Sequence, residues 1–290
     1  MTVATEEAPG ARSAASPRRE RLRVLMHSGT FIAGAVIVGF WIICALFGNH
    51  LVPQDPYADD LLNSLDGPSA DHWFGTDSLG RDIFSRVIIG SRDILSIAPL
   101  ATILGTVLGT ALGLVTGYFR GFIDDAIGRI VDAFLALPLV IIALLALVAL
   151  GTSNTTVVVV IGVVFAPIIA RTVRSAVLSE RELDYVAAAE LRGESALHIM
   201  FVEILPNVMP PILVESTVRL GYAIFAVATL SFIGFGIQPP SADWGLAIAD
   251  GYSYIAGGYW WTVLFDAVAI ASLVVGVNML ADGIQAALET

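Results

Sequence analysis

The stretch Ile94–Tyr118, ILSIAPLATILGTVLGTALGLVTGY, contains no charged residue. An α-helix rises 1.5 Å per residue, so about 20 apolar residues are enough to cross the ~30 Å hydrocarbon core of a bilayer. Runs of comparable length recur along the chain at Phe31–Gly48, Ile94–Tyr118, Ala126–Gly151, Val157–Thr172, Pro211–Ile233 and Trp261–Ala281. The sequence therefore predicts an all-α membrane protein with six transmembrane helices, the fourth of them kinked at Pro167.

The overall composition agrees with a membrane protein. Of 290 residues, 56% are hydrophobic and 14% are charged, and the mean hydropathy is +0.80, outside the usual balance of soluble domains. All fifteen basic residues are arginine, which excludes a Walker A phosphate loop because that motif needs a lysine. Cys44, His27, His50, His72 and His198 lie far apart, so packing or surface roles are favoured over a metal site.

The arginines predict the orientation, because positively charged short loops stay in the cytoplasm. One side of the predicted spans holds Arg12, Arg18, Arg19, Arg21, Arg23, Arg120, Arg129, Arg171, Arg174, Arg181 and Arg192, against Arg81, Arg86 and Arg92 on the other. Both termini are expected inside. The chain then divides into a mobile cytoplasmic tail (1–24), a first transmembrane helix with an outer loop (25–93), and a five-helix core (94–290) that includes a cytoplasmic loop (173–210).

The cytoplasmic loop carries signals for two short helices. Ser179 and Glu182 match a capping box, which predicts a helix start, and Gly193 is the expected left-handed stop. Leu183, Val186, Ala187 and Leu191 follow at helical spacing and predict one apolar face. A second segment, Ser195–Leu205, is expected to end at Pro206.

Charge decides what this loop contacts. An amphipathic hairpin resting on lipid would need a basic polar face. From residue 179 to 205 the chain has six acidic residues and two arginines: Glu180, Glu182, Asp184, Glu190, Glu194 and Glu203 against Arg181 and Arg192. Anionic lipid would repel such a face, so a protein partner is expected.

The loop resembles a known motif. Its pattern of Tyr-Val-x-Ala-Ala, then a glycine, then Leu-Pro-Asn is similar to the EAA loop of permease subunits of bacterial ABC importers, which docks into a groove on the ATPase subunit. The resemblance assigns coupling to Tyr185, Ala188, Ala189, Gly193, Pro206 and Asn207. Ala187 stands where many relatives have glutamate.

Four further stretches extend the resemblance along the chain. HWFGTDSLGRDIFSRVIIGSR (His72–Arg92) and LSFIGFGIQPPSADWG (Leu230–Gly245) are similar to signatures of dipeptide and oligopeptide permeases, specifically the second of the two paired membrane subunits. GYFRGFIDDAIGRIVDAFLALP (Gly117–Pro138) and NMLADG (Asn278–Gly283) occur in the matching order. Together they identify the chain as a member of that family.

The resemblance implies a type I ABC importer-like permease with a cytoplasmic coupling helix, in a bacterial cytoplasmic (inner) membrane. Its partners would be a second homologous permease subunit, two ATPase subunits carrying ATP and Mg, an extracytoplasmic substrate-binding protein and membrane lipid, without nucleic acid. The chain itself would hold no cofactor and would not be an enzyme. Its cargo would be dipeptides or short oligopeptides, with nickel or haem as the alternative.

Charges in the apolar runs suggest residues of a pathway, because each costs at least ~2.5 kcal/mol at the bilayer centre on insertion scales. Glu215 and Arg219 are candidate pathway residues, but they are four residues apart and are expected to pair, so a structural role is favoured for them. Asp266 has no such neighbour, so it is expected to face water or a partner chain and becomes a candidate pathway residue. Arg129 and Asp132 are expected to form a local pair.

The two outer loops are interpreted separately. In the first, Arg81 and Asp82 are candidate contacts for the binding protein, and the alternative is that the loop satisfies its own charges. In the second, Pro239, Pro240 and an exposed Trp244 are expected to make a rigid elbow.

Two other function classes are less favoured. A secondary transporter would need inverted repeats with broken helices and an acid at midplane, and only Asp266 suggests one. A membrane-embedded hydrolase would need a Ser-His or metal pair, and the predicted spans contain no histidine.

Overall fold

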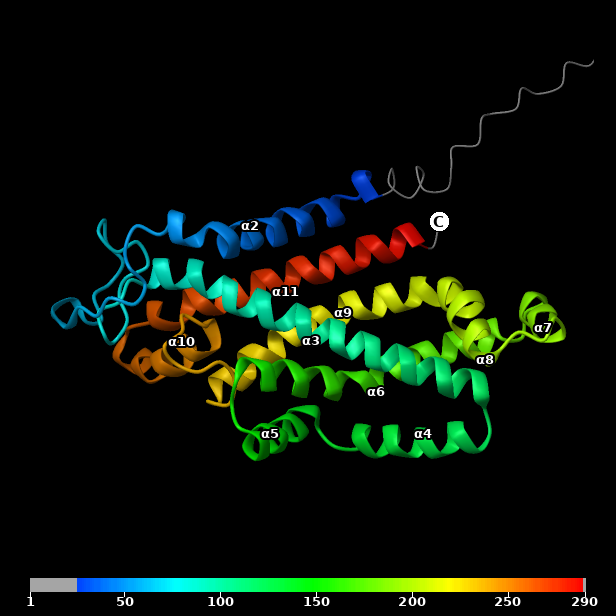
Figure 1. Ribbon diagram of the computed structural model, residues 1–290. Helices are drawn as coiled ribbons and strands as arrows, with labels where there is room; N and C mark the ends of the chain where they lie inside the picture. Colours follow the sequence, from blue (N-terminus) through cyan, green and yellow to red (C-terminus); the bar gives the residue numbers. More distant parts are fainter. Residues whose placement is uncertain (1–24, 289–290) are drawn as a thin grey trace, which may run out of the picture.

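Long helices running side by side give the molecule its shape (Figure 1). The computed structural model describes residues 25–288, so the predicted N-terminal tail, 1–24, lies outside the described part. The α-helices are α2 (Gly29–Leu51), α3 (Ile83–Phe119), α4 (Phe122–Leu135), α5 (Leu139–Leu150), α6 (Asn154–Glu180), α7 (Asp184–Leu191), α8 (Ala196–His198), α9 (Leu205–Phe232), α10 (Trp244–Gly251) and α11 (Trp261–Leu288). A π-helical segment, Ile199–Ile204, joins α8 to α9, and short 3-10 helices cover Leu61–Asn63 and Tyr252–Gly257.

The predicted spans correspond to five single helices and one broken pair. The helices α2, α3, α6, α9 and α11 are each long and apolar enough to cross a membrane, α9 together with α8 and the π-helical segment. The third predicted span, Ala126–Gly151, is not one helix: α4 and α5 meet at a bend of 90°. Pro138 lies at this break, where the proline ring pushes the preceding residue out of the helical region.

Glycines bring α3 and α6 together at the centre of the bundle. They recur at every fourth position of α3, at Gly105, Gly109, Gly113 and Gly117. A Cβ at Gly113 would lie 2.6 Å from the Cβ of Val173 on α6, and one at Gly109 would lie 2.6 Å from the Cβ of Ile169. Small residues at this spacing let membrane helices pack backbone against backbone.

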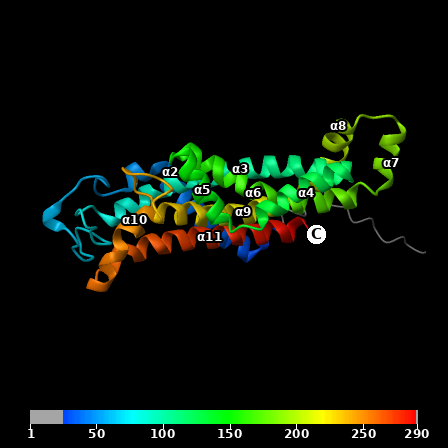
Figure 2. The same ribbon diagram turned by 90° about the horizontal axis from the view of Figure 1, so that it is seen from below.

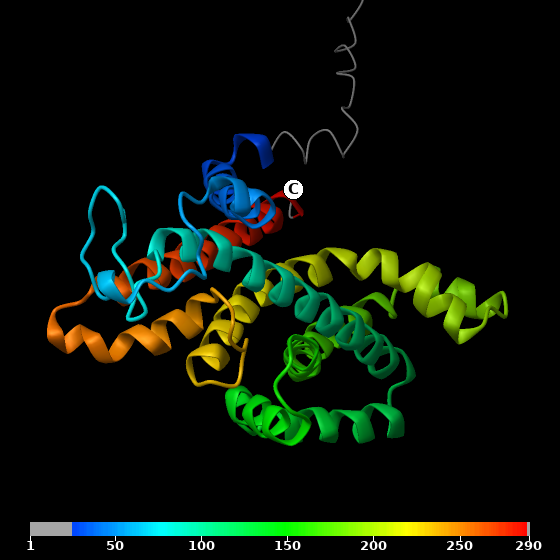
Figure 3. The same ribbon diagram turned by 60° about the vertical axis from the view of Figure 1, so that its left-hand side comes forward.

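The bundle has two different ends and two different flanks. The α7–α8 segment projects at the end of the bundle where α2 starts and α11 ends, whereas the loop before α3 and helix α10 occupy the opposite end (Figures 1 and 2). Helices α4 and α5 lie on one flank, opposite α2 and α11 (Figure 3). The topology thus places the predicted cytoplasmic loop and the predicted outer loops at opposite ends.

The end opposite α7 is held together by buried polar contacts. Arg86, 3% exposed, donates to the carbonyl of Pro56 at 3.1 Å and to that of Ser241 at 3.0 Å, which ties the two long loops together. The prediction of an exposed Trp244 was wrong: the residue is 0% exposed and its indole donates to the carbonyl of Val87 at 2.9 Å. This contact spans more than 150 residues of sequence, so local composition gave no signal for it.

Candidate functional site: the loop between α6 and α9

Helix α7 begins differently from the capping-box prediction. The first helix of this region is the end of α6, which continues to Glu180, and the hydroxyl of Ser179 donates to the carbonyl of Ser175 at 3.3 Å instead of capping a new helix. Helix α7 starts at Asp184 after Leu183, with no side-chain cap bond. The capping-box prediction was wrong because a serine already inside a helix bonds back along it.

At the glycine turn of the loop the prediction is confirmed, and at Pro206 it is wrong. Gly193 has φ +77°, the left-handed conformation expected after a helix. Ser195 caps α8 through a bond from the amide of His198 at 3.3 Å. Pro206, however, does not end the second segment: the π-helical segment runs directly into α9, and Pro206 is the second residue of α9.

Tyr185 links three parts of the loop. Its hydroxyl donates to Glu180 Oε1 at 2.9 Å at the end of α6 and accepts from Asn207 Nδ2 at 3.2 Å at the start of α9. Asn207 also donates to the carbonyl of Glu203 at 2.9 Å. Burial, with the hydrogen bond to Glu180, raises the pKa of Tyr185 to about 12, so the neutral phenol keeps this bridge at physiological pH. Two of the predicted coupling residues are thereby brought together.

A charged network closes the other side of the loop. Arg192 Nε contacts Glu194 Oε1 at 2.7 Å, and its terminal nitrogen contacts Glu203 Oε1 at 3.3 Å. His198 Nε2 lies 3.4 Å from Glu194 Oε2, and Glu182 pairs with Arg120 at the end of α3. Helix α7 is therefore fixed to α3, α6 and α9. These acids were predicted only as net charge. Glu182 and Glu203 pair with residues of other elements, whereas the Arg192–Glu194 and Glu194–His198 contacts are local in sequence.

One face of α7 is packed and the other is open. Val186 and Ala189 are 0% exposed and pack toward the π-helical segment. Ala187, Ala188 and Leu191 are exposed, Leu191 at 90%. The predicted single apolar face is thus divided, because only part of it meets the rest of the chain. The open part is a surface of small side chains beside the exposed Leu191, and a partner protein can approach it closely.

The predicted charge pair in α9 is present. Arg219 Nε lies 2.6 Å from Glu215 Oε1, and Thr172 of α6 donates to the other carboxylate oxygen at 3.3 Å. The Arg219 guanidinium also lies 5.0 Å from the ring centre of Tyr222. By contrast, the predicted Arg129–Asp132 pair was wrong, since Asp132 pairs with Arg171 of α6 at 3.3 Å.

The sequence led us to expect that Asp266 faces water or a partner chain. In the structure Asp266 lies inside the chain instead. The residue is 2% exposed and lines a cavity of about 20 Å³ with Arg81, Arg86 and Asp250 at the loop end. Tertiary packing supplies the charged neighbours that the sequence around Asp266 lacks. Its predicted role in the pathway is untested by this position.

The two residues predicted to contact a binding protein have different surroundings. Arg81 Nε contacts Asp77 at 2.7 Å, and 17% of its side chain is exposed. Asp82 has a side chain 1% exposed and caps α3 by accepting from the amide of Ser85 at 2.8 Å. A direct contact through Asp82 would require the loop to open, whereas Arg81 already reaches the surface.

Comparison with known families decides the class. Residues 109–290 match the model of the binding-protein-dependent transport system inner membrane component. The chain belongs to this family. Residues 16–68 match a second model, the N-terminal transmembrane domain of oligopeptide transport permease C.

Similar curated proteins are peptide permeases. The chain is 39% identical over 277 residues to a dipeptide transport system permease protein of Alkalihalophilus pseudofirmus, covering 96% of this chain and 91% of the relative. It is 37% identical to a probable D,D-dipeptide transport system permease protein of Escherichia coli K12, covering 92% and 89%. It is 39% identical to a glutathione transport system permease protein of Salmonella paratyphi A, covering 94% and 88%.

A solved structure supports the fold. A methionine ABC transporter in an inward-facing conformation matches 70% of this chain and 96% of its own with a TM-score of 0.57 at 21% identity. The chain is thus a multi-pass membrane permease of the dipeptide/oligopeptide ABC importer family with a type I permease fold.

Proposed function

We propose that this permease is one half of the membrane pathway of an ATP-driven importer for dipeptides or short oligopeptides, in the bacterial cytoplasmic membrane. Relatives named for dipeptide transport, and one named for glutathione, which is itself a short peptide, support this cargo. A second homologous permease would complete the pathway, and an extracytoplasmic binding protein would deliver the peptide. ATP and Mg would bind to two separate ATPase subunits, so this chain would hold no cofactor and hydrolyse nothing itself.

The charges favour a cytoplasmic position for the α7 end. Arg120, Arg171, Arg174 and Arg192 lie toward that end, and positive charge marks cytoplasmic loops. The opposite end has fewer arginines: Arg81, Arg86 and Arg92. In this orientation the described ends of the chain are both on the cytoplasmic side.

The single observation that carries the coupling mechanism is that α7 is hydrogen-bonded to α6 and α9 and yet open on one face. Tyr185 joins it to α6 and α9, while Ala188 and Leu191 remain exposed. An ATPase subunit whose groove binds this face can move α6 and α9, because hydrogen bonds connect these helices to α7 and transmit its displacement. Gly193 sets the turn after α7, Pro206 lies at the start of α9, and Ala189 anchors α7 beneath the open face.

The remaining candidates keep separate proposed roles. Glu215 and Arg219 are candidates for the pathway, where their ion pair lowers the cost of charge at membrane depth. Asp266 would act from its position on α11, where it lines a cavity with the first outer loop, α3 and α10. Arg81 would contact the binding protein.

The experiment is to purify the assembled transporter with its binding protein and to measure which compound stimulates ATP hydrolysis. We expect dipeptides and tripeptides to stimulate it. Stimulation by nickel ions or haem, without a response to any peptide, would overturn the cargo while leaving the family unchanged. Uptake that follows an ion gradient and ignores ATP would overturn the mechanism.

A further inference from the structure

Two hollows meet on the flank of the bundle between α3, α4 and α6. The first has a volume of about 380 Å³, and its charged lining consists of Asp124, Asp125, Arg129, Asp132, Arg171 and Arg174. The second has a volume of about 400 Å³ and is lined by Leu, Ile, Val, Phe, Ala and Pro side chains. Leu112, Ile127 and Val131 line both, so the charged and the apolar hollow lie side by side.

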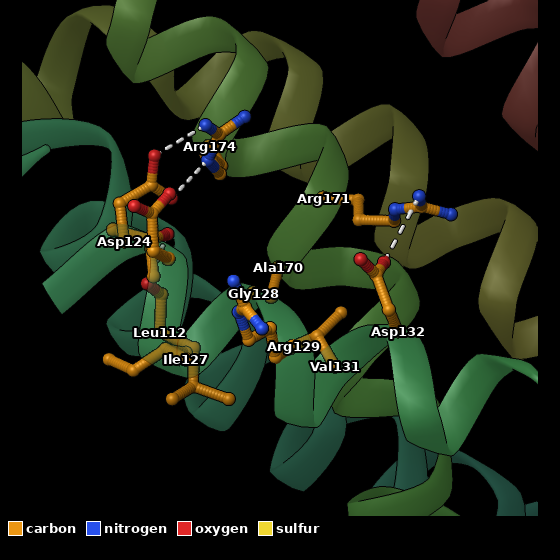
Figure 4. A pocket seen from close by; sticks show the side chains of 12 residues that line it. Leu112, Asp124, Ile127, Gly128, Arg129, Val131, Asp132, Ala170, Arg171 and Arg174 are labelled. Carbon is orange, nitrogen blue, oxygen red and sulfur yellow. Dashed lines mark hydrogen bonds and ion pairs between the residues drawn. The ribbon is translucent and has the colours of Figure 1, made fainter. Parts of the chain in front are cut away.

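The charges of the first hollow are not all used by the chain. Arg174 binds both carboxylate oxygens of Asp124 at 2.6 Å, and Arg171 contacts Asp132 at 3.3 Å. Figure 4 shows these two pairs at opposite sides of the hollow with Arg129 between them. Within residues 25–288, neither Arg129 nor Asp125 has an ion pair within 4.0 Å, and both are exposed. One cation and one anion therefore remain available to a ligand.

The direction of the second hollow follows from α3. Thr116, which lines the charged hollow, is near the α7 end of α3, and Leu108, which lines the apolar one, is eight residues earlier. Eight residues of helix span about 12 Å. The apolar hollow thus runs from the charged one toward the middle of the bundle. Several of its side chains are free at the surface, including Ile130 at 61% and Val163 at 41% exposure.

We propose that these adjacent hollows bind one zwitterionic phospholipid of the phosphatidylethanolamine type. Its phosphate lies beside Arg129 and Arg171, its ammonium faces Asp125, and an acyl chain occupies the apolar hollow. The charge pattern selects this head group: a purely anionic lipid leaves Asp125 without a partner, and a quaternary ammonium cannot donate a hydrogen bond to it. A dipeptide also carries both charges, but it has no long aliphatic chain to fill the second hollow.

The test uses the assembled transporter in nanodiscs that contain phosphatidylethanolamine with a photoreactive group on its acyl chain. Two variants separate charge from shape. Arg129→Gln removes the free cation, and Ala111→Phe fills the apolar hollow at an exposed alanine of its lining. Arg92→Gln is the matched control, because Arg92 is an exposed arginine at the opposite end of α3. After irradiation, peptide mapping locates the labelled residues.

We expect label on α3 and α4 between residues 108 and 134 and on α6 near residues 163–167. Arg129→Gln should reduce this label about tenfold, the effect of losing one charge-assisted contact. Ala111→Phe should reduce it similarly, and Arg92→Gln should leave it unchanged. Equal labelling of the parent and both variants would overturn the proposal. So would equal labelling by phosphatidylglycerol or phosphatidylcholine probes, displacement of the label by a dipeptide, or cross-links that place a segment of the second permease in the apolar hollow.

Discussion

Replacing Tyr185 by phenylalanine tests whether α7 is a rigid lever. The substitution keeps the ring and removes a hydroxyl that donates to Glu180 at 2.9 Å and accepts from Asn207 at 3.2 Å. Both bonds are partly exposed, so each is expected to contribute about 1 kcal/mol at most. Losing both should raise the open population of the loop about 5- to 30-fold.

Hydrogen exchange measures this opening directly. Amides of residues 184–193 exchange through local opening, so their rates in the assembled transporter should rise by the same factor. Less peptide should also be transported for each ATP hydrolysed, because an open loop transmits motion poorly. Tyr252→Phe is the control, since Tyr252 is 59% exposed at the opposite end and its ring meets only the edge of Phe232 among the described aromatic contacts. Unchanged exchange and unchanged coupling in Tyr185→Phe would refute the reasoning.

Three further predictions concern stability. Gly113→Leu should lower the unfolding midpoint of the transporter, at a cost of about 3 kcal/mol or more, because a Cβ there would lie 2.6 Å from that of Val173. Gly39→Ala is the control and should leave the midpoint unchanged, because a Cβ at Gly39 would have no atom within 4 Å. Equal midpoints for the two variants would contradict the close packing of α3 and α6. Arg86→Gln should cost about 2–4 kcal/mol, because two backbone carbonyls lose a buried donor; a midpoint like the parent's would show that the two loops are held by something else. Burial raises the pKa of Asp243 to about 6, so the folded state binds the proton more tightly than the unfolded state. The free energy of unfolding should therefore fall by about 2 kcal/mol as pH rises from about 4 to about 6. In Asp243→Asn this part of the pH profile should flatten, and an unchanged profile would exclude Asp243 as its source.

The helical membrane fold could be predicted because apolar length is a local property. Runs such as Ile94–Tyr118 lie within helices of the structure, and Gly193 marks a helix end by its own backbone freedom. The Glu215–Arg219 pair was also predictable, since residues four apart on one helix are neighbours. Pro138 was the signal that could have divided the third run, but mean hydropathy does not register a single breaking residue.

What the sequence left open depends on contacts between distant segments. Trp244 was expected at the surface because its loop is rich in proline and glycine, and it is buried by packing against α3 and against Trp41 of α2. Asp132 has Arg129 nearby in sequence but Arg171 nearby in space. The bridge from Tyr185 to Asn207 joins residues 22 positions apart. The motif therefore named both of these residues, but their contact required the fold.

The central claim is that separate ATPases move this permease through α7 to import peptide. Its most direct test is uptake of a labelled dipeptide into proteoliposomes with the binding protein outside and ATP within, comparing the complete transporter, this chain alone, and a transporter carrying Ala188→Trp on the open face of α7. We predict ATP-dependent uptake by the complete transporter only, and loss of uptake in the variant with its helices still folded. Uptake by this chain alone, or full uptake by the variant, would contradict the account.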